Sequence, residues 1–116
     1  MNANLTFDSV VYNKQFDENG FSKRQNTSRG INTPDVLSIK NESYTDSVTK
    51  VAGTRFLVRF DRHDIDAAGE KRISSIYAVI AVPSTAESTD IDDIVAKFRA
   101  AVADADLIDG VLNGEV

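Results

Sequence analysis

The clearest pattern in the chain is the alternation of apolar and polar residues over Arg55–Arg62. Such alternation predicts a strand with one face in the core and the other toward solvent. Weaker alternation predicts a strand over Val36–Glu42, and the polar stretch Ser43–Gly53 either extends that strand or turns. A last strand is predicted over Ile73–Val82, which Pro83 ends. Because both faces of this segment are apolar, we expect it to be a central strand.

The residues before these strands predict shorter extended pieces. Leu5–Tyr12 reads as extended, and Asp17–Gly20 has the composition of a turn. Residues 10–25 therefore look like a β-hairpin. Asn26–Pro34 and His63–Lys71 are polar and contain glycine, and we expect both to be loops.

After Pro83 the hydrophobic period changes from two to between three and four residues. Thr89 is a suitable N-cap, and aspartates follow it in the first turn, where the helix dipole favours carboxylates. One apolar stripe is formed by Ile91, Ile94, Val95, Phe98 and Val102. A second, shorter helix is predicted over Ala105–Leu112, with Gly114 as its C-terminal cap.

Strands first and helices last predict an α+β fold with helices on one face of an antiparallel sheet. Two helices, one of them short, cannot cover a sheet of five or six strands. Either the open face meets water or a ligand, or a second subunit covers it.

Composition excludes several classes of functional site and of protein. The 116 residues fit a single domain, residues 1–116. There is no cysteine and only one histidine, His63, which excludes disulfides, zinc–thiolate sites and paired-histidine catalysis. The longest apolar run, Ile76–Val82, is too short to cross a membrane, and no secretory signal is visible. Asp64–Gly69 begins like a calcium loop, but Ser75 stands where the bidentate glutamate is needed.

No nucleophile–base pair or phosphate-binding glycine motif is present, so we expect neither an enzyme nor a bound cofactor or metal. His63 reads as a turn residue rather than a base, and the carboxylates near the C-terminus as a solvated helix surface.

Charge is distributed unevenly along the chain. Residues 1–86 carry 11 Lys+Arg and 10 Asp+Glu, a net of +1. Residues 87–116 carry 2 Lys+Arg and 8 Asp+Glu, a net of −6. An acidic C-terminal quarter is thus attached to a nearly neutral body.

One set of residues suits nucleic acid. If the three strands are neighbours, the sheet face opposite the core would carry Ser38, Lys40, Arg55, Arg59 and Tyr77. Phosphates bind cations, and an unpaired base stacks on an aromatic ring. An ordinary solvated face would have the same composition, so these residues alone leave both interpretations open.

The C-terminal half resembles the coat proteins of the single-stranded RNA bacteriophages (levivirus type). The resemblance rests on the strand Ile76–Val82 carrying Tyr77-Ala78 and on a helix start, Ser88–Asp90, eleven residues after Tyr77. It also rests on the terminal helix Leu107–Asn113. It covers about residues 55–113, whereas residues 1–54 agree in pattern only.

The resemblance implies an N-terminal hairpin (1–25), a five-stranded antiparallel sheet (36–83) and two C-terminal helices (89–113). It further implies an intertwined homodimer with one continuous sheet, in which the stripe on the first helix belongs to the dimer core. Dimers would form an icosahedral shell, usually T=3, in the host cytoplasm, with genomic RNA against the sheet. One RNA hairpin bound there would repress translation.

Two other functions stay open. A small dimeric α+β module could hold a ligand or peptide against an open sheet without forming a capsid. A catalytic domain is the least favoured function, since no catalytic set is present.

Overall fold

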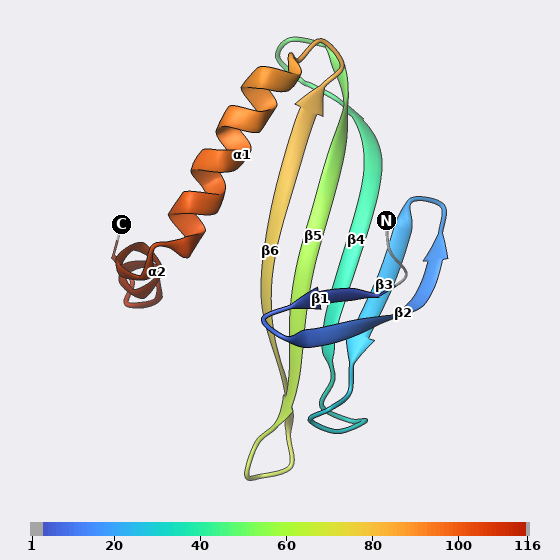
Figure 1. The fold of residues 1–116 in the computed structure, drawn as a ribbon, viewed down its shortest axis with the longest axis vertical. Helices are drawn as coiled ribbons and strands as arrows, with labels where there is room; N and C mark the ends of the chain where they lie inside the picture. The colour runs from blue at the N-terminus through green and yellow to red at the C-terminus, as the bar shows by residue number, and fades with distance from the viewer. Residues whose placement is uncertain (1–3, 116) are drawn as a thin grey trace. The chain divides into compact units, whose positions relative to one another are not determined.

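The computed structural model describes residues 4–115, which form two compact units, one ending at Ala81 and one beginning at Val82. The first unit holds the strands and the second the helices (Figure 1). The elements are β1 (Leu5–Phe7), β2 (Val10–Glu18), β3 (Phe21–Asn26), β4 (Asp35–Thr45), β5 (Ala52–Ile65), β6 (Lys71–Pro83), α1 (Ser88–Ala103) and α2 (Ala105–Leu112).

The strands form a six-stranded sheet in the order β1-β2-β3-β4-β5-β6. The α+β class is confirmed, but the expected five-stranded sheet is wrong by one strand. The extended segment Leu5–Tyr12 is in fact β1 and the first residues of β2, which pair antiparallel. The chain reverses at Asp8 and Ser9, whose φ angles of 50° and 63° lie in the left-handed region. Aspartate tolerates that region better than most residues, because its short side chain can hydrogen-bond locally.

The hairpin predicted within residues 10–25 is confirmed as β2 and β3. Its turn is Asn19-Gly20, and both residues have positive φ, as a two-residue hairpin turn with the twist of the sheet requires. Gly20 also lies close to β4, since its carbonyl oxygen accepts a 2.7 Å hydrogen bond from the Asn41 N–H.

β4 and β5 pair antiparallel over eleven positions. The polar stretch Ser43–Gly53 was expected either to extend the strand or to turn, and it does both. β4 continues to Thr45, and the loop after it is held by Asp46, whose Oδ1 accepts 2.8 Å hydrogen bonds from the Val48 and Thr49 N–H groups.

Two expectations about β5 and β6 are wrong. His63 was expected in a loop, but it lies within β5, and its N–H donates to the Pro34 carbonyl at 3.1 Å. The connecting loop is residues 66–70. β6 is the last strand of the sheet rather than a central one. Several of its apolar residues remain exposed, among them Ile73 and Val79, and Ile76 is 77% accessible.

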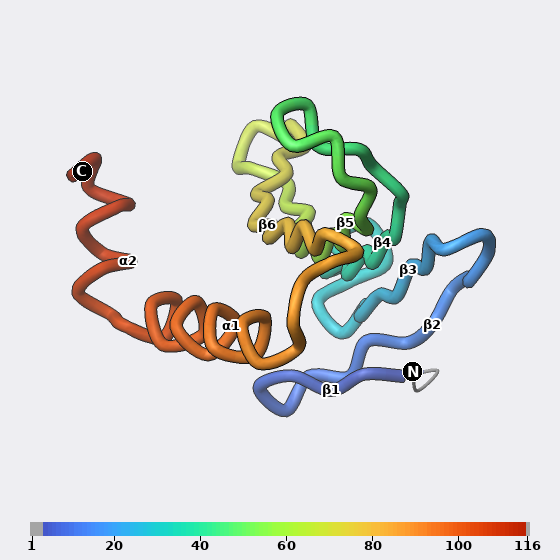
Figure 2. Tube along the Cα trace, turned by 90° about the horizontal axis from the view of Figure 1, so that it is seen from above, coloured from blue at the N-terminus to red at the C-terminus, as the bar shows by residue number. Residues whose placement is uncertain are grey.

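The two faces of the sheet differ in chemistry. We call the side that carries Leu37, Ile39, Val58, Phe60 and Ile76 the apolar face. β1 and the beginning of β2 cross over this face (Figures 1 and 2). The rings of Phe7, Tyr12 and Phe60 meet there with centroid separations of 5.9–6.1 Å.

The buried core of the strand unit is small. Among the described residues, the buried apolar side chains are Val36 and Leu37. Arg24 is also buried, opposite Leu37, and its Nη1 donates to Ser22 Oγ at 2.8 Å.

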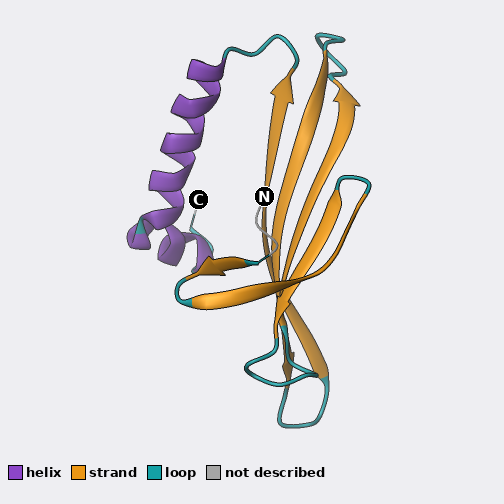
Figure 3. Cartoon of the chain, turned by 45° about the vertical axis from the view of Figure 1, so that its right-hand side comes forward, coloured by secondary structure: helices purple, strands orange, loops and turns teal. Residues whose placement is uncertain are grey.

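The helical unit begins differently from the expectation. The N-cap of α1 is Glu87 and not Thr89, because the Glu87 carbonyl already accepts hydrogen bonds from the N–H groups of Asp90 and Ile91 at 3.1 and 3.2 Å. The helix therefore starts one residue before Thr89. α2, the shorter of the two helices in Figure 3, has the predicted bounds. It is capped by Asp104, whose carboxylate accepts from the Leu107 N–H at 3.0 Å.

Candidate nucleic-acid interface

The register of β4 and β5 brings most of the candidate RNA-binding residues together. Ser38 lies opposite Arg59, Lys40 opposite Leu57, and Glu42 opposite Arg55. Side chains of directly paired residues in a ladder point to the same face. These two strands therefore present both arginines, the lysine and the serine hydroxyl on the side opposite the apolar face.

β6 adds the aromatic residue of the candidate set. The guanidinium of Arg59 lies 5.9 Å from the centre of the Tyr77 ring, and Ser75 Oγ donates to Asp61 Oδ1. Odd-numbered residues of β6 thus share the face of Arg59 and Asp61. All five candidates therefore lie on one surface of the sheet, which we call the polar face. Together with the residues that share it, this face consists of Ser38, Lys40, Glu42, Tyr44, Arg55, Leu57, Arg59, Asp61, Ser75, Tyr77 and Val79.

The polar face is less basic than its cations suggest. Glu42 lies 3.4 Å from both Lys40 Nζ and Arg55 Nη1. Asp61 accepts from Arg59 Nε at 2.9 Å. Lys40, Arg55 and Arg59 exceed these two carboxylates by one positive charge, and Lys23, which is paired with Ser38, adds a second on the same face. The carboxylates hold the arginine side chains in place, and they compete with any phosphate that approaches.

Asp61 stays ionised in this arrangement. Burial raises the pKa of its carboxyl, but hydrogen bonds from Ser75 and Arg59 outweigh burial and leave the pKa below its ordinary value. Arg59 therefore faces a full negative charge at neutral pH, while its side chain remains 44% exposed.

Tyr44 is a residue of the polar face that the sequence reasoning missed. It lies near the end of β4, opposite Gly53, and the guanidinium of Arg55 stands 4.9 Å from the centre of its ring. Continued alternation along β4 would have placed it on the face of Lys40, but that depended on whether Ser43–Gly53 extends the strand.

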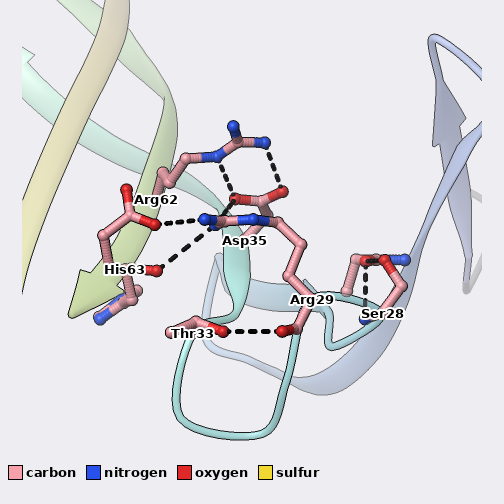
Figure 4. A network of polar contacts seen from close by, with 8 residues as sticks. Ser28, Arg29, Thr33, Asp35, Arg62 and His63 are labelled. Carbon is pink, nitrogen blue, oxygen red and sulfur yellow. Dashed lines mark hydrogen bonds and ion pairs between the residues drawn. The ribbon is translucent and has the colours of Figure 1, made fainter. Parts of the chain in front are cut away.

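A second polar cluster holds the loop 27–34 against the strands (Figure 4). Asp35 accepts two hydrogen bonds from Arg62, at 2.8 and 2.9 Å. Arg29 in the loop lies 3.6 Å from Asp35 and also donates to Asp64. Asp64, expected in the loop His63–Lys71, is instead a β5 residue that binds the loop 27–34 through Arg29.

The Asp35–Arg62 pair predicts that the folded chain loses stability at acidic pH. The hydrogen bonds from Arg62 hold the pKa of Asp35 below its ordinary value. Because the folded pKa is the lower one, Asp35 adds stability above its unfolded pKa of about 3.9 and loses it as pH falls through the folded value. Urea unfolding from pH 7 into acid should show Asp35→Asn less stable than wild type at pH 7. The gap should narrow in acid, and a constant gap would contradict this role.

Three of the five residues in the stripe expected in a dimer core are exposed in the single chain. Ile94, Phe98 and Val102 are 62%, 50% and 48% accessible, and α1 contains no buried residue. Ile91 and Val95 are half-buried.

Between residues 4 and 115, no group of three or more His, Cys, Asp or Glu side chains could hold a metal ion. No helix in the same range has the length and apolar character needed to cross a membrane.

Comparison with known proteins gives a match at the level of the fold. No family model and no curated protein matches the chain. Among solved structures, the chain is similar to one from the virus-like particle of Wenzhou levi-like virus 1. The TM-score is 0.60 and the identity 13%, over 98% of this chain and 97% of that one. The resemblance to levivirus-type coat proteins is thereby confirmed for the fold, over the N-terminal half as well.

Proposed function

We propose that this chain, which has the fold of a levi-like virus particle subunit along nearly its whole length, is the capsid protein of a single-stranded RNA phage. The observation that carries the proposal is the large apolar surface that β6 and α1 leave exposed, although the chain buries only a small core. β6 ends the sheet with Ile76 exposed, and the stripe on α1 is exposed as well. A soluble chain rarely leaves such surfaces uncovered.

A second copy of the chain covers these surfaces. Two β6 strands join edge to edge, so that each exposed row of N–H and C=O groups finds a partner and the two sheets become one. The α1 stripe then packs on the apolar face of the other subunit. Dimers assemble into an icosahedral shell, of T=3 type by the resemblance, in the host cytoplasm and then in the virion.

The polar face binds genomic RNA on the inside of the shell. Its cations attract phosphates, and Tyr77 provides a ring for an unpaired base. The excess negative charge of residues 87–116 favours placing the helices on the side away from RNA. A hairpin bound on this face represses translation. Since Leu57 and Val79 offer no hydrogen bonds, we expect modest discrimination between hairpins.

RNA affinity of unassembled protein at several salt concentrations tests the role of the polar face. Arg59→Ala should weaken binding to every RNA and lower the salt slope by about one, the value for one lost phosphate contact. Tyr77→Ala should reduce the binding free energy for a looped hairpin by about 1–3 kcal/mol, and should reduce that for duplex RNA by less. If both variants bind as wild type does, RNA binds elsewhere.

Size separates the capsid from the alternative. Expressed protein should elute as a particle of megadalton scale with nucleic-acid absorbance. Elution as a dimer without nucleic acid, at any concentration and salt, would instead favour a small ligand-binding module.

A further inference from the structure

The polar face holds a second pair of arginine and tyrosine that repeats the Arg59–Tyr77 pair. Arg55 lies over the Tyr44 ring at 4.9 Å, on the β4 side of β5, whereas Arg59 lies over Tyr77 at 5.9 Å on the β6 side. The two arginines are four residues apart on β5, about 13 Å at about 3.3 Å per residue. The same chemistry therefore occurs twice on one surface.

We propose that Arg55 and Tyr44 form a second stacking site for an unpaired nucleotide of single-stranded RNA. This inference rests on the proposed function of the polar face and extends it. The site is layered: Tyr44 is half-buried and forms the lower layer, while Arg55, 44% exposed, forms the upper one. A base stacks on the outer face of the guanidinium plane, as bases stack on arginine as well as on aromatic rings.

Three features hold the guanidinium plane of Arg55 in position and leave it accessible to a base. Glu42 holds Arg55 from the neighbouring strand, with its Oε1 3.4 Å from Nη1. The ring of Tyr44 supports the guanidinium from below through a cation–π contact. Gly53 stands opposite Tyr44 in the ladder, so no side chain covers the ring from the directly paired position. Lys40, also bound to Glu42, is then placed to meet the phosphate of the stacked nucleotide.

Arg55→Lys separates stacking from charge, because lysine keeps the positive charge but has no flat plane. The probes are a short unpaired oligoribonucleotide and an abasic strand of equal length, measured on unassembled full-length protein. Arg55→Lys should weaken binding to the oligoribonucleotide roughly 5- to 150-fold, the range for one lost base stack. Its affinity for the abasic strand and its salt slope should stay at the wild-type values.

Two further variants complete the test. Tyr44→Leu should reproduce the effect of Arg55→Lys, since the plane loses its support. Arg72→Lys is the same chemical change at an exposed position of β6 where no stacking is proposed, and it should bind as wild type does.

The outcomes distinguish this inference from the function on which it rests. If Arg55→Lys binds RNA as wild type does while Arg59→Ala is weakened, the polar face binds RNA and the second stacking site is wrong. If Arg55→Lys loses affinity for the abasic strand equally, the guanidinium contacts the RNA backbone, through a bidentate phosphate pair that lysine cannot make, and the inference is again wrong. If Arg59→Ala also binds normally, the proposed RNA face fails together with the inference.

Discussion

Phe98→Ala should abolish the dimer and, with it, the particles. In the single chain the Phe98 side chain is half exposed, so its removal from a monomer would cost little. In the proposed dimer it packs against the sheet of the other subunit, where truncation of a buried phenylalanine costs about 3–5 kcal/mol. Sedimentation over a range of concentrations and thermal unfolding measure the two consequences.

The matched control lies on the same helix. Lys97 pairs with Asp93 across one turn at 2.8 Å, and both side chains are exposed. Lys97→Ala should change stability by less than about 0.5 kcal/mol and leave the dimer intact. A Phe98→Ala protein that remains dimeric and as stable as wild type would place the interface elsewhere.

Ile76→Lys should be as damaging, although Ile76 is among the most exposed apolar residues. On the single chain it lines a hollow of about 310 Å³ with Tyr12 and Phe60, beside the open edge of β6. If a second subunit covers that hollow, the substitution buries an unpaired ammonium group, a change on the order of 3–5 kcal/mol. The variant should be monomeric or unfolded at concentrations where wild type is dimeric, as sedimentation would show.

Val48→Lys provides the comparison. Val48 is 88% exposed in the loop after β4, far along the chain from β6, and is not part of the proposed dimer interface. It should leave dimerisation unchanged. If Ile76→Lys and Val48→Lys are both dimeric, Ile76 remains exposed in solution and does not lie in the dimer interface.

Local periodicity predicted the strands well, because burial on one face leaves a direct trace in the sequence. The alternation over Arg55–Arg62 and the spacing of the α1 stripe both correspond to observed elements. The reversal at Asp8 and Ser9 left no such trace, since neither residue is the glycine that usually marks positive φ.

The position of β6 shows what periodicity leaves undetermined. Apolar residues on both faces correctly indicate a strand, but they do not fix its position in the sheet. The strand is at the edge of its own sheet. In the proposed dimer, the β6 strand of a second subunit pairs with this edge.

The candidate RNA site was predictable in its cations and ring, but not in its pairing. Which carboxylate neutralises which arginine depends on strand register, and the register of β4 against β5 places Glu42 beside Arg55. Tyr44 was missed for a related reason, since its face is defined only once β4 is known to run to Thr45.

Electron microscopy of the purified recombinant protein tests the central claim most directly. The capsid proposal predicts closed shells of uniform diameter with density for nucleic acid beneath the protein layer, and predicts their loss in Phe98→Ala. Fields that contain only small, non-assembled protein, under conditions where the wild-type chain is folded and RNA is present, would contradict it.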